Sequence, residues 1–96
     1  MSRVKSIMSN VPVCLICKAE YPLHRHHVYG GHGRREKSER YGCWVYLCPK
    51  HHNMSAQGVH FNKKLDTWLK RECQARWEKQ YGDRDKFIEE FGRSYL

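Results

Sequence analysis

Two pairs of metal-binding residue types, each with two residues between its members, constrain the fold of this chain more than any other feature. Cys14 and Cys17 form the first pair, Cys48 and His51 form the second, and 30 residues lie between the pairs. Two intervening residues let both side chains of a pair reach one ion from a tight turn, and four such donors suit tetrahedral zinc. The spacing therefore predicts a structural zinc site that joins two regions distant in sequence.

The total number of cysteines supports metal binding over disulfide bonding. The chain has five cysteines, and an odd number fits a disulfide framework poorly. A redox role for Cys14 and Cys17 is the alternative, but such a motif is expected beside a βαβ pattern, which this sequence lacks. Cys43 and Cys73 occupy apolar positions and are predicted to lie in the core. A domain of only 96 residues often needs a metal as an additional constraint.

The charge of the chain indicates a polyanionic partner. Lys and Arg number 18 against 10 Asp and Glu, a formal net charge of +8, which favours nucleic acid. The apolar fraction of 40% and the charged fraction of 29% are those of an ordinary folded domain. No apolar run is long enough for a signal-peptide core or a membrane span, so we expect a cytoplasmic protein without a membrane partner.

The chain is predicted to form one domain, 1–96, of the α+β class. Residues 1–12 are expected to be a flexible basic lead-in, residues 13–60 hold all seven histidines and four of the five cysteines, and residues 61–96 are expected to be a helical extension. Apolar and aromatic runs predict strands at 21–29 and 43–48. The polar segment 32–42 suits a loop or a short helical turn, and Pro49 favours a helix from Lys50 to about Ala56.

Two helices are predicted in the C-terminal third. Asn62 is a suitable N-cap for a long helix that ends near Tyr81 and Gly82. Apolar residues recur every four positions along it and are assigned to the core: Phe61, Leu65, Leu69, Cys73, Trp77 and Tyr81, with Trp68 widening the stripe. Asp83 or Asp85 is expected to cap a short final helix that carries Phe87, Ile88 and Phe91 and ends at Gly92.

The histidines predict a second, open metal site. On a strand, His26 and His27 point to opposite faces and cannot serve one role together. His52 follows the expected zinc ligand His51 on a new helix and points elsewhere. The second site is therefore predicted from His26 and His52, with His60 as third ligand or Asn53 as its alternative. His24 and His32 are expected to be surface or DNA-contacting residues, which are more often inert than functional.

The order Cys-x-x-Cys, His-His-hydrophobic and Leu-Cys-x-x-His-His-Asn resembles the HNH (His-Me finger, ββα-metal) endonuclease family. The resemblance covers residues 14–60 and is closest to the zinc-stapled branch of phages and prophages, which includes a phage recombination-enhancement nuclease. It implies a small ββα-metal core within 13–60, stapled by the structural zinc. The implied activity is metal-dependent hydrolysis of phosphodiester bonds in DNA with low sequence specificity, with RNA left open. Phage or host recombination or replication proteins are the implied partners.

The resemblance also implies roles for individual histidines. His26 would bind the catalytic metal together with His52 and His60, and His27 would be the general base. Magnesium or manganese is the expected metal, with zinc or nickel as alternatives. Many members have an asparagine that orients the base, but residues 29–47 contain none. We therefore expect a backbone carbonyl near Cys43 or Trp44 to hold His27.

The segment after the histidine doublet is the expected phosphate contact. Arginine and lysine suit phosphate, and glycines allow close approach of the backbone. The residues assigned to nucleic-acid binding are Arg34, Arg35, Lys37 and Arg40. The basic residues of the long helix, Lys63, Lys64, Lys70, Arg71 and Arg76, are expected to be a solvated face. Two alternatives to a nuclease stay open: a non-catalytic zinc-stapled nucleic-acid-binding module, and a partner subunit whose nuclease site has decayed.

Overall fold

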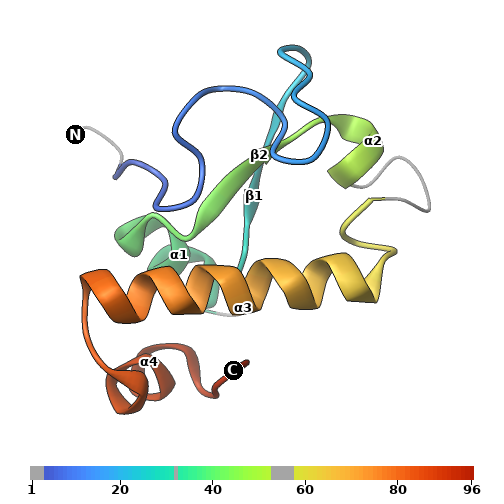
Figure 1. The fold of residues 1–96 in the computed structure, drawn as a ribbon. Helices are drawn as coiled ribbons and strands as arrows, with labels where there is room; N and C mark the ends of the chain where they lie inside the picture. Colours follow the sequence, from blue (N-terminus) through green and yellow to red (C-terminus); the bar gives the residue numbers. More distant parts are fainter. Residues whose placement is uncertain (1–3, 32, 53–57) are drawn as a thin grey trace.

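A short hairpin and four helices make up the structure, a computed structural model that describes residues 4–31, 33–52 and 58–96. The long helix crosses beneath the hairpin, and the final helix lies below it (Figure 1). This arrangement confirms the predicted α+β class. In chain order the elements are β1 (His24–His27), α1 (Arg34–Tyr41), β2 (Trp44–Leu47), α2 (Pro49–His52), α3 (Lys63–Gln80) and α4 (Arg84–Phe91).

The two strands pair antiparallel and are shorter than predicted. His24 pairs with Leu47, and His27 pairs with Trp44 at the other end. One further backbone bond, from Val28 N–H to the carbonyl of Cys43, extends the ladder beyond β1. The register places His24 and His26 on one face of the hairpin and His27 on the other, because side chains alternate along a strand.

The connection between the strands contains an eight-residue helix, α1, which is longer than the short helical turn that was one of the two predictions for this segment. Its Arg, Glu and Lys residues are good helix formers. The glycines at its two ends made the segment look like a loop in the sequence. Gly33 and Gly42 lie in the left-handed region at its two ends, with φ of 78° and 72°. A Cβ atom on Gly42 would lie 2.2 Å from the carbonyl oxygen of Lys5, so only glycine fits there.

The N-terminal segment, predicted to be a loose lead-in, packs along the hairpin from residue 5 onward. Ile7 N–H donates to the carbonyl of Gly42 over 2.9 Å, and the Ser6 hydroxyl donates to the carbonyl of Trp44. Met8 is buried in the core. These contacts lie along β2, whereas the histidine doublet lies on β1.

The helix starts predicted from capping residues are confirmed. The side chain of Asn62 accepts a hydrogen bond from Leu65 N–H, and that of Asp83 accepts one from Lys86 N–H. Gly92 ends α4 with φ of 91°. For α2 only Pro49–His52 is described. The rest of its predicted range lies outside the described residues, as do His32 and Asn53.

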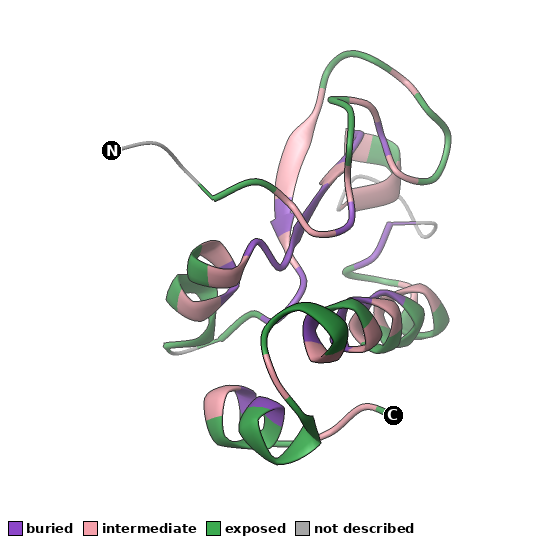
Figure 2. Cartoon of the chain, turned by 60° about the vertical axis from the view of Figure 1, so that its left-hand side comes forward, coloured by how far each residue is buried: buried purple, intermediate pink, exposed green. Residues whose placement is uncertain are grey.

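The core forms where the hairpin, α3 and α4 face one another (Figure 2). Leu69, Cys73 and Trp77 of α3 are fully buried there. The assignment of three residues of this stripe to the core is wrong, because Phe61, Trp68 and Tyr81 are exposed by 67%, 48% and 39%. Phe61 and Tyr81 lie just outside α3, and Trp68 lies about 100° around the helix from the buried Leu69.

Among the helices that the structure describes, none combines the length and the apolar character that crossing a membrane requires.

Candidate functional site

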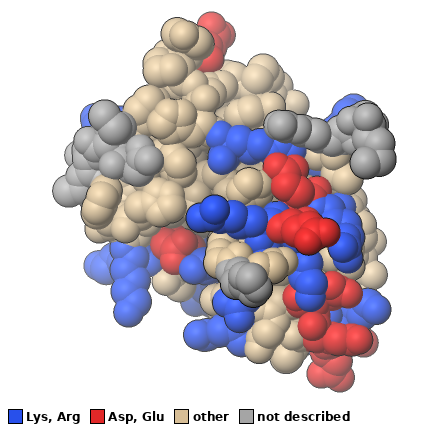
Figure 3. All heavy atoms as spheres, turned by 180° about the vertical axis from the view of Figure 1, so that it is seen from behind, with Lys and Arg blue, Asp and Glu red and all other residues tan. Residues whose placement is uncertain are grey.

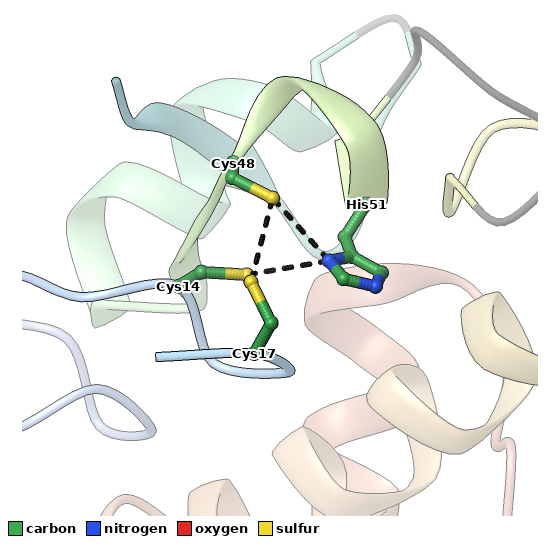
Figure 4. A group of neighbouring side chains, drawn as sticks. All are labelled: Cys14, Cys17, Cys48 and His51. Carbon is green, nitrogen blue, oxygen red and sulfur yellow. Dashed lines mark hydrogen bonds between the residues drawn. The ribbon is translucent and has the colours of Figure 1, made fainter. Parts of the chain in front are cut away.

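The predicted zinc ligands come together in one cluster. The side chains of Cys14, Cys17, Cys48 and His51 point toward one another, and their donor atoms all lie within 4.8 Å (Figure 4). The Cys17 and Cys48 sulfur atoms are 3.7 Å apart, and Cys48 Sγ lies 3.3 Å from His51 Nδ1. Donors of a tetrahedral zinc ion are separated by about 3.3–3.8 Å. The cluster could therefore hold a structural zinc.

Backbone hydrogen bonds hold both halves of this cluster. Cys14 N–H donates to the carbonyl of Ala19 and closes the first turn, while Leu15 N–H donates to Tyr46 and attaches that turn to β2. The carbonyl of Cys48 accepts from His51 N–H over 3.0 Å, which turns the imidazole back toward the sulfur atoms. A bound zinc would thus join the N-terminal turn to the end of β2.

The thiol of Cys14 is prepared for metal binding. Burial acts to raise its pKa, but the backbone amides of Cys17, Cys48 and Ile16 together outweigh burial and lower the pKa to about 6. The thiolate is the form that binds zinc, and it is favoured near neutral pH at this position.

Three of the remaining histidines form a second cluster. His26 on β1, His52 on α2 and His60 before α3 have donor nitrogens within 4.8 Å of one another. The Nε2 atoms of His52 and His60 are 3.0 Å apart. His60 N–H also donates to the carbonyl of His52, so the backbone itself holds this pair together. The triad predicted from sequence is therefore assembled, and it could hold a second metal.

One donor atom of the triad has no hydrogen-bond partner among the described residues. His26 Nε2 is buried and has no hydrogen-bond partner in the part of the chain that the structure describes. Buried polar atoms are nearly always paired, and a metal would supply the partner. His24 Nδ1 lies 2.9 Å from His52 Nδ1, which occupies that nitrogen and leaves Nε2 of His52 to the triad. His24, expected at the surface, thus contacts a residue that could bind the metal. The sequence could have indicated this contact, because His24 lies two residues before His26 and therefore on the same face of the strand.

Burial and neighbouring imidazoles lower the pKa of two of the three histidines. Burial and the neighbouring imidazoles lower the pKa of His26 to about 3, and burial with His60 and His24 lowers that of His52 to about 4. Both rings are therefore uncharged at neutral pH, and neutral imidazole is the form that binds metals.

His27 lies on the opposite face of β1 and contacts a carboxylate. Its Nε2 atom is 2.9 Å from Oε1 of Glu39 on α1. The other carboxylate oxygen of Glu39 lies 2.8 Å from Arg25, whose guanidinium stacks on Trp44 at 3.6 Å from the ring centroid. The expectation of a backbone carbonyl partner is corrected, because a side chain holds His27. Sequence reasoning missed Glu39, which lies in the segment read as a loop.

The ionisation state of Glu39 determines the tautomer of His27. Burial acts to raise the pKa of Glu39, but the hydrogen bond from His27 and the charge of Arg25 outweigh it and lower the pKa. An ionised carboxylate can only accept hydrogen bonds, so Nε2 of His27 must donate. In the neutral ring, Nδ1 is then the atom that can accept a proton.

Both faces of β1 open into one cavity of about 510 Å³. Asp66, which the sequence did not indicate, and Lys70, which was expected on a solvated face, form part of its wall and pair with each other over 2.8 Å. The cavity therefore brings imidazoles, a carboxylate and cations within reach of one ligand. Its lining consists of Arg25, His26, His27, Val28, Gly30, Arg35, His52, Val59, His60, Asp66 and Lys70.

Of the four basic residues assigned to nucleic acid, Arg35 alone lines this cavity. Lys37 pairs with Glu90, Arg40 lies 3.7 Å from Glu36, and Arg34 packs against Gly92. Acidic side chains are interspersed among the basic ones on the face shown in Figure 3. Arg35 therefore lies at the cavity together with Arg25 and Lys70, and a phosphate contact of the four residues stays a prediction.

Comparison of the chain with protein-family models, curated proteins and solved structures gave no match. The structure by itself establishes a small α+β domain, with a hairpin followed by a helix, a Cys₃His cluster and a His triad.

Proposed function

We propose that this chain is a metal-dependent endonuclease of the HNH type that hydrolyses phosphodiester bonds in DNA. The observation that carries the proposal is the shared cavity. The triad of His26, His52 and His60, of which His26 is buried and His60 exposed, lines the same space as the carboxylate-held His27. Cations surround that space, as a phosphate ligand requires.

In this proposal His27 is the general base. The Nδ1 atom takes a proton from water, the resulting hydroxide attacks phosphorus, and the bond to the leaving oxygen breaks. Glu39 holds the ring through Nε2 and stabilises the positive charge that the ring acquires. Arg35 and Lys70, which line the cavity, would contact phosphate oxygens. When bound by the triad, a divalent metal supplies stabilisation of negative charge on the phosphate and the leaving oxygen.

The donor set bears on the identity of that metal. The triad offers three imidazoles and no carboxylate, and the nearby Asp66 is paired with Lys70. Imidazole suits nickel and zinc, whereas magnesium and manganese prefer oxygen ligands. Of the metals expected from the sequence, nickel and zinc fit this set better than magnesium or manganese.

One observation favours the alternative of a non-catalytic zinc-stapled nucleic-acid-binding module. Glu39 contacts both Arg25 and His27, so the network also attaches α1 to β1 whether or not chemistry occurs. In that case His27 would have a structural role, and the cations at the cavity would bind nucleic acid without cleaving it.

Nicking of supercoiled plasmid tests the proposal. The zinc-loaded protein is incubated with Mg²⁺, Mn²⁺ or Ni²⁺ beside a His27→Ala variant. We expect nicking that depends on added metal and falls by about 10²- to 10⁴-fold in the variant, because a general base contributes that much. Zinc content and circular dichroism verify that the variant is folded. Salt-sensitive DNA binding without nicking under any of the three metals would instead establish the binding module.

A further inference from the structure

Trp68 lies on the surface of α3, where an apolar side chain of this size needs an explanation. The indole is 48% exposed, whereas the other two tryptophans, Trp44 and Trp77, are buried. An exposed aromatic side chain is a common feature of recognition surfaces, because it offers a large apolar face at low entropic cost.

The residues around Trp68 form a groove with a positive rim. Lys64, Trp68, Arg71 and Ala75 recur at spacings of four, three and four and therefore share one face of α3. They line a groove of about 790 Å³ together with Lys63, Thr67, Glu72 and Leu96. In the described part of the chain no ion pair joins Lys63, Lys64 or Arg71 to an acidic residue. The groove thus combines three unpaired cations and one carboxylate with an exposed indole.

The chemistry of this surface matches an unpaired nucleotide. A nucleobase stacks on an indole, and lysine and arginine beside it neutralise the adjoining phosphates. Base stacking needs no particular sequence, and the groove shows no code for base edges. An apolar peptide would cover Trp68 but leave the three cations without partners.

We propose that this face of α3 binds single-stranded nucleic acid, with a base stacked on Trp68 and phosphates at Lys64 and Arg71. Asp66 and Lys70 of the same helix line the histidine cavity, so the two surfaces lie about one helix diameter apart, or about 10–12 Å. A strand held at Trp68 would keep the adjoining nucleic acid close to that cavity. The binding does not depend on the proposed cleavage and is measured without it.

Intrinsic fluorescence tests the proposal, since Trp44 and Trp77 are buried and quenching by a bound base reports Trp68. Zinc-loaded protein without other added metal is titrated with oligothymidylate and, separately, with a duplex of equal length. We expect quenching by the single strand and weaker binding of the duplex. Trp68→Leu retains an apolar helix former but removes the ring, and should weaken binding about 5- to 150-fold by anisotropy of a labelled strand.

Matched variants separate stacking from charge and from folding. Phe61→Leu removes a second exposed aromatic side chain outside the groove and should leave affinity unchanged. Arg71→Ala should reduce the dependence of log K on log salt by about one. Circular dichroism of Trp68→Leu should match the unmodified protein, because the side chain lies at the surface.

Three outcomes would overturn this inference. Equal affinity of Trp68→Leu and the unmodified protein for the single strand is the first, and tighter binding of the duplex is the second. The third is a concentration-dependent dimer that Trp68→Leu abolishes, because the groove would then bind a second copy of the chain. If the protein binds the single strand but does not nick plasmid, only the proposed nuclease is contradicted. If it nicks plasmid but Trp68→Leu binds the single strand as tightly as the unmodified protein, only the proposed binding surface is contradicted.

Discussion

His27 Nε2 and Glu39 Oε1 lie 2.9 Å apart and join β1 to α1 across 12 positions of sequence. The ionised carboxylate fixes which imidazole nitrogen carries the proton, so Glu39 acts on any proton transfer through His27 and not on the substrate itself. In this chain a carboxylate stands where an asparagine or a backbone carbonyl was expected.

Replacing Glu39 with alanine should slow nicking by about tenfold or more, as part of the general-base contribution is lost with the orientation of His27. The measurement is the nicking rate of supercoiled plasmid with the best metal. Nitrogen NMR shifts of His27 should at the same time show a mixture of tautomers in place of one. Glu36→Ala removes an exposed carboxylate of the same helix and should change neither readout. An unchanged tautomer in Glu39→Ala would contradict the role of Glu39.

Replacing Cys48 with serine should remove the bound zinc and the cooperative unfolding transition. The thiolate is one of four donors, and in small domains the binding energy of zinc is largely folding energy. Zinc content by elemental analysis and circular dichroism during urea unfolding provide the two readouts. Removal of zinc from the unmodified protein by a chelator should have the same effect, and added zinc should reverse it. A folded, metal-free Cys48→Ser protein would rule out a structural zinc.

Replacing His24 with alanine should weaken the second metal site while leaving the zinc cluster intact. His24 holds His52 through Nδ1, and loss of such a partner lowers metal affinity by about 10- to 100-fold. Calorimetric titration of the zinc-loaded protein with Mn²⁺ or Ni²⁺ measures the effect. His52→Ala should abolish this binding, while the zinc content stays at one per chain in both variants. Equal affinity in His24→Ala would show that the imidazole contact does not orient His52.

Replacing Asn62 with alanine should lower the free energy of unfolding by about 1 kcal/mol, because the N-cap bond to Leu65 N–H is lost. Asn62→Asp keeps an acceptor and should retain most of the stability. Urea unfolding with zinc present gives both values, and an unchanged slope with denaturant concentration would show that the native fold is preserved. A loss in Asn62→Asp equal to that in Asn62→Ala would contradict capping.

The two tryptophans of α3 should differ sharply in their contribution to stability. Trp77→Ala empties a fully buried position among Phe87, Phe91 and Tyr41 and should cost about 3–5 kcal/mol. Trp68→Ala removes a surface side chain and should change stability by no more than about 0.5 kcal/mol. Both are measured by urea unfolding of the zinc-loaded protein. Similar losses for the two variants would place Trp68 in the core.

The sequence by itself predicted the local features of this protein. The two Cys/His pairs, the caps Asn62 and Asp83 and the aromatic residues of the final helix depend on spacings of a few residues, which chain geometry fixes locally. Strand alternation likewise placed His26 and His27 on opposite faces. Local sequence patterns predicted α1 less well, because glycines flank it at both ends and glycine is also typical of loops.

Only the tertiary structure determined which distant side chains meet. The contact between His27 and Glu39 depends on α1 folding back onto β1, and that of His24 with His52 depends on the position of α2 beside the hairpin. The exposure of Trp68 follows from where the core lies, because its side chain lies about 100° around α3 from that of the buried Leu69. These relationships arise from packing between elements, and packing depends on the whole chain at once.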